Sequence, residues 1–339
     1  MRTLHQISWL LRLRNGAARR MAMLALIALQ AGLCTAQTAT PKSTSEPVRE
    51  WVTFTAERVA KDCAKPCNRH AVIFVHGIFG ARETWLNSDT SQYFPALIAD
   101  DASMDDVDIL RADYENYMLQ AGPSMKDVLE SFTRGMIKIH QREYKTIQFV
   151  AHSLGGVVVR RYLLHVKARY GHKTLSLYRQ AILLGTPLDG SYFSSIAQIS
   201  SSNQLLRVIT PINQNDFLQM LNASIDDLSK KHHQTFCPSL DFYAGFEKKA
   251  TFLDKIVSPE SAARAIGCSV SLSQRNQCIR GFDKTHPALA KPSDKDDPVY
   301  RWVTSLVRDC ADGKTCSADR ILPGCGEMES FTRGSPSKW

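Results

Sequence analysis

Ser153 stands where a serine could act as a nucleophile. It is the centre of Ala151-His-Ser-Leu-Gly155, between an apolar run expected to form a strand (146–151) and a stretch expected to form a helix (154–169). A sharp strand-to-helix turn leaves room only for small side chains two residues either side of the serine, and Ala151 and Gly155 meet that need. Such a turn would expose the hydroxyl near the positive end of the helix dipole. The pentapeptide alone is equally compatible with a serine that only caps the helix.

A second motif favours the catalytic interpretation. The apolar run 71–76 leads directly into His76-Gly77-Ile78-Phe79-Gly80. Gly77 would let the backbone turn so that the next N–H faces the nucleophile. The N–H groups of Ile78 and Leu154 would then form an oxyanion hole for the tetrahedral intermediate of acyl transfer. We expect His76 to hydrogen-bond this loop.

Three segments, VIFVHGIFG, FVAHSLGGVVVRRYL and LLGTPLDGS, resemble motifs of the α/β-hydrolase superfamily, and in particular its branch of lipases and GPI-inositol-deacylase-like serine esterases. The resemblance extends from about Ala71 to Leu306. Ala151 departs from the usual glycine, but small bacterial lipases carry the same alanine. The resemblance implies an α/β-hydrolase fold, hydrolysis of carboxylic esters through an acyl-enzyme, a Ser–acid–His triad in that chain order, and neither a metal nor an organic cofactor.

The base is expected on a loop after the last strand, where an imidazole could take the proton from Ser153. Among the histidines beyond residue 36, only His286 lies late enough in the chain. The resemblance supports this choice, because the family's histidine precedes a Lys-Pro pair and a closing helix, which Lys291-Pro292 and the expected helix from Pro298 match. The alternative is a loop histidine that only caps a turn.

Three carboxylates compete for the role of the acid that orients the imidazole. Asp254 follows the expected strand 241–244 and matches the family's D-x-x-V…S-A pattern. Asp241 begins that strand and would point toward the opposite edge of the sheet. Asp283 is three residues from His286, and sequence neighbours on a loop rarely face each other. The resemblance therefore assigns the role to Asp254.

Other residues near these motifs have structural explanations. His152 is expected to pack beside the nucleophile. Thr186-Pro187 is expected to form a turn, although its position also allows a contact with substrate. Between residues 190 and 235, apolar residues at helical spacing fit a protein core better than a lipid-binding surface; they are Leu205, Leu206, Val208, Ile209, Phe217, Leu218 and Leu221.

Strands and helices alternate along the chain, which predicts a mostly parallel sheet with helices on both faces. Ser124, with Asp127 three residues later, predicts the start of a helix that runs to about residue 143. Ser258-Pro259 and Asp297-Pro298 each place a capping residue before a proline at the first helical position. Apolar runs predict strands at 71–76, 107–114, 146–151, 180–184 and 241–244.

We expect one α/β-hydrolase domain over residues 51–309. Residues 190–235 contain no strand-like run, and they are expected to form a helical cap inserted into the domain. A cysteine-containing C-terminal extension (310–339) would follow.

The N-terminal segment predicts export. Residues 1–20 carry five arginines and no acidic residue, Met21–Leu33 is apolar, and Cys34-Thr-Ala36 supplies small residues for cleavage. This arrangement is typical of a signal peptide covering residues 1–36. The apolar run is shorter than the ~20 residues that span a bilayer, and an uncleaved anchor is the alternative. Residues 37–50 would be a flexible lead-in.

Removing the signal peptide lowers the net charge from +9 to +4 and the number of cysteines from nine to eight. So small a net charge, without a block of basic residues, does not predict binding to nucleic acid. An even number of cysteines in an exported chain favours disulfides. The simplest pairing joins Cys63 to Cys67, Cys268 to Cys278, Cys310 to Cys316 and Cys237 to Cys325; a zinc site at Cys63 and Cys67 lacks a second ligand pair nearby.

The expected substrate is therefore a small-molecule or lipid ester, with transient contact to a membrane or lipid surface and an oligomeric state that the sequence does not predict. Two rival functions stay open. One is amide, peptide or thioester hydrolysis on the same scaffold, and the other is a non-catalytic secreted binding module.

Overall fold

The computed structural model describes residues 49–59, 69–78, 80–114, 122–190, 204–210, 213, 215–235, 240–250, 257–264 and 278–313. The elements below belong to the unit Glu50–Trp339. No helix in this described part of the chain is both long enough and apolar enough to cross a membrane.

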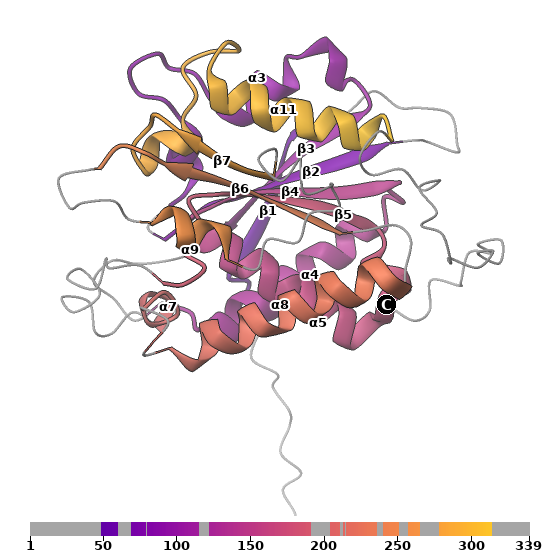
Figure 1. Ribbon diagram of the computed structural model, residues 1–339. Helices are drawn as coiled ribbons and strands as arrows, with labels where there is room; N and C mark the ends of the chain where they lie inside the picture. Colours follow the sequence, from indigo (N-terminus) through magenta and orange to yellow (C-terminus); the bar gives the residue numbers. More distant parts are fainter. Residues whose placement is uncertain are drawn as a thin grey trace, which may run out of the picture. The chain divides into compact units, whose positions relative to one another are not determined.

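The described strands form one mostly parallel sheet in the order β1-β3-β2-β4-β5-β6-β7 (Figure 1). Only β1 runs antiparallel to its neighbour, β3. Every residue of β2 and β4 is buried, as expected of strands covered on both faces. The strands are β1 (Val52–Arg58), β2 (His70–Val75), β3 (Val107–Tyr114), β4 (Thr146–His152), β5 (Tyr178–Leu184), β6 (Asp241–Glu247) and β7 (Ile279–Phe282).

Helices cover both faces of the sheet, which confirms the predicted architecture. Alternate residues of β2 point to opposite sides: Ile73 and Val75 join the core under α4, α5 and α8, whereas Val72 and Phe74 join the core under α3 and α11 (Figure 1). The helices are α3 (Phe94–Ala99), α4 (Met125–His140), α5 (Leu154–Leu175), α7 (Gln204–Arg207), α8 (Asp216–Thr235), α9 (Pro259–Ala263) and α11 (Pro298–Ala311), with 3-10 turns η1 (Arg82–Trp85), η2 (Ala102–Met104) and η5 (Pro287–Ala290).

The described part of the segment 190–235 contributes α7 and α8. Leu205, Leu206, Ile209, Leu218 and Leu221 are buried in the same core as the sheet, and Val208 and Phe217 pack against it. These residues therefore belong to the core, as predicted, and do not form a lipid-binding surface.

Helix α8 lies along α5 and reaches the loop after β5. Arg160 Nη1 on α5 donates to Asn222 Oδ1 on α8 at 2.8 Å, and Asn222 Nδ2 donates to the carbonyl of Leu188 at 2.7 Å. The polar bridge ties this helix to the edge of the sheet where the candidate residues lie.

The predicted helix starts are confirmed. Ser124 and Asp127 form a reciprocal capping box at α4, and Ser258 and Asp297 accept hydrogen bonds from the first turns of α9 and α11. The predicted strand 241–244 ends too early, because β6 continues to Glu247.

Cys278 and Cys310 are both buried and disulfide-bonded. Their predicted partners, Cys268 and Cys316, lie outside the described residues, as do the other two predicted pairs. The predicted signal peptide lies outside them as well.

Removing the helix cap at Asp297 should lower the free energy of unfolding more than removing the cap at Ser124. Burial raises the pKa of its carboxyl, but hydrogen bonds from Lys284 Nζ and from the N–H groups of Val299 and Ser293 outweigh this and lower it. We predict that Asp297→Ala lowers the free energy of unfolding by about 2–3 kcal/mol, since a cap and a buried charge partner are lost together, and that Ser124→Ala lowers it by about 1 kcal/mol.

Urea unfolding of both variants measures this difference. Because the folded pKa of Asp297 is depressed, its contribution is complete at neutral pH and is lost as the pH falls through the folded pKa. Equal losses in the two variants at neutral pH would contradict the assignment.

Candidate active site

Ser153 forms the turn between β4 and α5 in a left-handed backbone conformation. Its φ is 53°, which is rare for a residue with a side chain and costs roughly 1–3 kcal/mol. Two hydrogen bonds hold it there: its N–H donates to Leu184 O at 2.9 Å, and its carbonyl accepts from Gly156 N at 3.1 Å. The strand–turn–helix context predicted for the serine is present.

Small residues let the neighbouring backbones approach this turn. A Cβ on Gly155 would press directly on the carbonyl oxygens of Val75 and His76, at the end of β2. A Cβ on Gly77 would lie 2.7 Å from Ser153 Cβ and 3.3 Å from Ser153 Oγ. The loop after β2, which continues to Ile78, therefore lies against the serine.

His76 holds that loop, as the sequence predicts. Its Nδ1 lies 2.8 Å from Gly77 O, while its Nε2 accepts from Tyr114 N at 3.1 Å, so the proton is on Nδ1. The Tyr114 ring stacks on the imidazole at 4.3 Å and its hydroxyl donates to His76 O at 2.9 Å. Burial lowers the pKa of His76, so the ring stays neutral and donates to the loop.

His286 follows β7 and pairs with a carboxylate that the sequence analysis did not consider. Its Nδ1 lies 3.1 Å from Glu247 Oε1, and Glu247, at the end of β6, is completely buried. Burial raises the pKa of Glu247, but the hydrogen bonds from His286 and from Val257 N–H, the latter at 2.8 Å, lower it below its ordinary value. The ionised carboxylate therefore keeps the His286 proton on Nδ1 and leaves Nε2 able to accept a proton.

Asp254 lies outside the described residues. Its rival Asp283 forms an exposed ion pair with Lys249 at 3.1 Å, and Asp241 lies at the opposite end of β6 from Glu247. One sequence signal could have identified Glu247. It is a glutamate three residues past the predicted end of a strand, and that end lies at the same sheet edge as Ser153.

Two further contacts join the serine turn to the His286 loop. His152 Nε2 donates to His286 O at 3.0 Å, and the two rings lie 4.8 Å apart. A Cβ on Gly185 would lie 2.9 Å from the His286 ring, and Gly185 follows Leu184, which accepts from Ser153 N. Thr186 is buried against Gly156. Ser153, His286 and Glu247 thus lie at the same edge of the sheet, with His152 and Gly185 linking the serine turn to the His286 loop.

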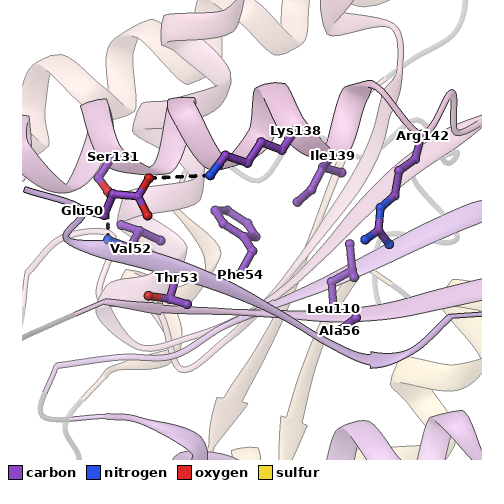
Figure 2. A pocket seen from close by; sticks show the side chains of 11 residues that line it. Glu50, Val52, Thr53, Phe54, Ala56, Leu110, Ser131, Lys138, Ile139 and Arg142 are labelled. Carbon is purple, nitrogen blue, oxygen red and sulfur yellow. Dashed lines mark hydrogen bonds and ion pairs between the residues drawn. The ribbon is translucent and has the colours of Figure 1, made fainter. Parts of the chain in front are cut away.

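A pocket of about 240 Å³ lies away from this edge, between β1 and α4 (Figure 2). Lys138 and Glu50 pair across it at 3.6 Å, and Ser131 accepts from Val52 N at 2.9 Å. None of its lining residues is a predicted catalytic residue; they are Glu50, Val52, Thr53, Phe54, Ala56, Leu110, Ser131, Gly135, Lys138, Ile139 and Arg142. Within the described ranges, no three histidine, cysteine or acidic side chains are grouped so as to hold a metal ion.

The sequence matches one protein family. The family described as "Putative serine esterase (DUF676)" covers residues 65–237, just over half of the chain. No curated protein matches.

Similar solved structures include lipases and a phospholipase. Mature lipase BlEst2 from Bacillus licheniformis is 14% identical, with a TM-score of 0.46 over 77% of this chain and 97% of its own. Phospholipase PlaB from Legionella pneumophila is 16% identical, with a TM-score of 0.41 over 54% of this chain, which spans only 38% of PlaB. A soluble variant of monoglyceride lipase from Saccharomyces cerevisiae is 11% identical, with a TM-score of 0.43 over 78% and 91%.

Gly155 should tolerate no side chain. We predict that Gly155→Ala lowers the free energy of unfolding by about 3 kcal/mol, because backbone at the end of β2 must move and the loop at Gly77 moves with it. Gly281→Ala is the matched control, since the nearest atoms to its Cβ would belong to the ends of the Lys248 and Phe246 side chains. Similar losses of stability in both variants, measured by urea unfolding, would refute the close approach.

Proposed function

Because the chain belongs to the "Putative serine esterase (DUF676)" family, we propose that it hydrolyses carboxylic esters through an acyl-enzyme on Ser153. One observation supports the proposal above all. The strained serine turn and the buried pair of His286 and Glu247 lie at the same edge of the sheet. The family description is that of an esterase, and we assign the nucleophile, the base and the orienting acid to Ser153, His286 and Glu247.

In the proposed reaction, Ser153 Oγ attacks the ester carbonyl carbon while His286 Nε2 takes the hydroxyl proton. The carbonyl π electrons move onto oxygen, and the N–H groups of Ile78 and Leu154 stabilise this oxyanion. When the intermediate collapses, the C–O bond to the alcohol breaks and His286 returns the proton to the departing oxygen. Water then repeats the sequence on the acyl-enzyme and releases the acid.

We assign the orienting acid to Glu247, in the role that the family resemblance implies for Asp254. Glu247 is buried, its Oε1 lies on Nδ1 of the base, and a second hydrogen bond from Val257 N–H fixes the same oxygen. An ionised carboxylate in this place stabilises the imidazolium that forms when Ser153 loses its proton.

The proposed substrate is a small-molecule or lipid ester, with transient contact to a lipid surface. Amides, peptides and thioesters would use the same steps, so a panel of esters, thioesters and amides of varied acyl length separates these classes. A non-catalytic binding module would turn over none of them.

Three substitutions test the triad. We predict that Ser153→Ala abolishes ester turnover and fluorophosphonate labelling, and that Glu247→Gln lowers kcat by a factor on the order of 10²–10⁴, because the neutral amide no longer stabilises the imidazolium. Asp254→Asn should stay within about threefold of the wild type.

The kcat and KM of each variant give the answer, with circular dichroism as the folding control. A large loss in Asp254→Asn, together with an active Glu247→Gln, would return the role to Asp254. Full activity in Ser153→Ala would overturn the whole proposal.

We also propose that the protein is exported, through cleavage after Ala36. The basic and apolar composition of residues 1–36 supports this, and so do the disulfides at Cys278 and Cys310, which persist in oxidising compartments. Expression of the full chain in a secreting host should give a mature N-terminus at Gln37. An intact N-terminus, found by mass spectrometry in a cell-associated fraction, would contradict cleavage and favour an anchor.

A further inference from the structure

His152 links the two halves of the candidate active site. It is the last residue of β4, directly before Ser153, and its ring reaches the main chain of His286. We propose that His152 is a positioning residue that sets the separation between nucleophile and base, by hydrogen-bonding the backbone of His286. This inference rests on the proposed function, because it gives a role to a residue beside the proposed triad.

The main-chain side of the link is rigid. His152 pairs with Leu184 in the register of β4 and β5, and the next N–H, that of Ser153, donates to Leu184 O at 2.9 Å. The His152 side chain is only 7% exposed. Its Cα therefore moves only if the sheet moves, and the ring extends from a fixed point.

The His286 end needs a second anchor. Its ring is hydrogen-bonded at Nδ1 by Glu247 and lies against Gly185, and these contacts hold the side chain rather than the main chain. Its carbonyl accepts from Leu289 N at 3.4 Å in η5, which is long, and from His152 Nε2 at 3.0 Å. His152 thus supplies the shorter of the two contacts that fix where the base loop begins.

The His152 ring performs this without carrying charge. Its Nε2 faces a carbonyl, so Nε2 holds the proton, and its buried Nδ1 has no hydrogen-bond partner among the described residues. Burial, with a smaller contribution from the neighbouring His286, lowers the pKa of His152 to about 3. A neutral ring 4.8 Å from His286 leaves the imidazolium of the proposed reaction unopposed by a second positive charge.

Packing alone would explain why residue 152 has a ring, but it would not explain why that ring has an N–H donor. Trp85 lies edge-on to His152 at 6.4 Å, a contact that a phenylalanine ring could also make. The two explanations therefore predict opposite orders for two variants. His152→Phe keeps the ring and loses the donor, whereas His152→Gln loses the ring and keeps an N–H donor at about the reach of Nε2.

We expect His152→Phe to fold with a Tm close to that of the wild type, because the loss of an unpaired buried nitrogen offsets the loss of the hydrogen bond to His286 O. Its kcat should fall about 10- to 100-fold with KM within about threefold, because a shift of about 1 Å between nucleophile and base costs on the order of 10² in rate. The rate of fluorophosphonate labelling of Ser153 should fall in parallel. His152→Gln should keep at least about a third of the wild-type kcat.

A His152→Phe variant as active as the wild type, or more active than His152→Gln, would overturn the inference. If His152→Phe does not fold, His152→Met, which also lacks the donor, takes its place with the same expected result. Ser153→Ala distinguishes failure of the proposed function from failure of this inference. Activity in Ser153→Ala would defeat the proposed function. An inactive Ser153→Ala together with a fully active His152→Phe would defeat only the role of His152.

Discussion

Ser153 is held with a φ of 53° between a buried strand and the helix that follows it, and this conformation makes demands on every neighbouring segment. The turn fits only because Gly155 presents no Cβ to the end of β2, and because Gly77 lets the next loop lie against the serine. The strain is sustained by the hydrogen bond from Ser153 N–H to Leu184 in the adjacent strand. The sheet thus holds a costly backbone geometry in place at a buried serine, as is common at functional sites.

Three histidines lie around this turn, and their surroundings give them different roles. His76 and His152 are buried without a carboxylate in hydrogen-bond contact, so their pKa values are lowered and each acts as a neutral donor to a carbonyl. His286 alone bonds a buried carboxylate, Glu247. The site therefore has one imidazole paired with a carboxylate and two that hold the loops carrying Ile78, the proposed oxyanion-hole residue, and His286, the proposed base.

Much of this arrangement could be predicted from local sequence, and its failures have a physical cause. The run at 146–151, the turn at Ser153 and the cap at Asp297 are local signals, because burial on both faces and helix capping act within a few residues. Glu247 was missed because the last two residues of β6, Phe246 and Glu247, pair with β7 beyond the register of β5. Since β7 is four residues long and contains Gly281, its strand signal is weak, and the extension is a product of tertiary pairing.

Trapping the covalent intermediate is the most direct test of the proposed acyl-enzyme on Ser153. The wild-type protein is mixed rapidly with a slowly deacylating ester, quenched in acid, digested and mapped by mass spectrometry. If Ser153 is the nucleophile, an acyl group forms in a burst on the peptide that contains Ser153, and it is released on incubation with water. Turnover of the ester with no acyl group on Ser153 at any time would contradict this role of Ser153.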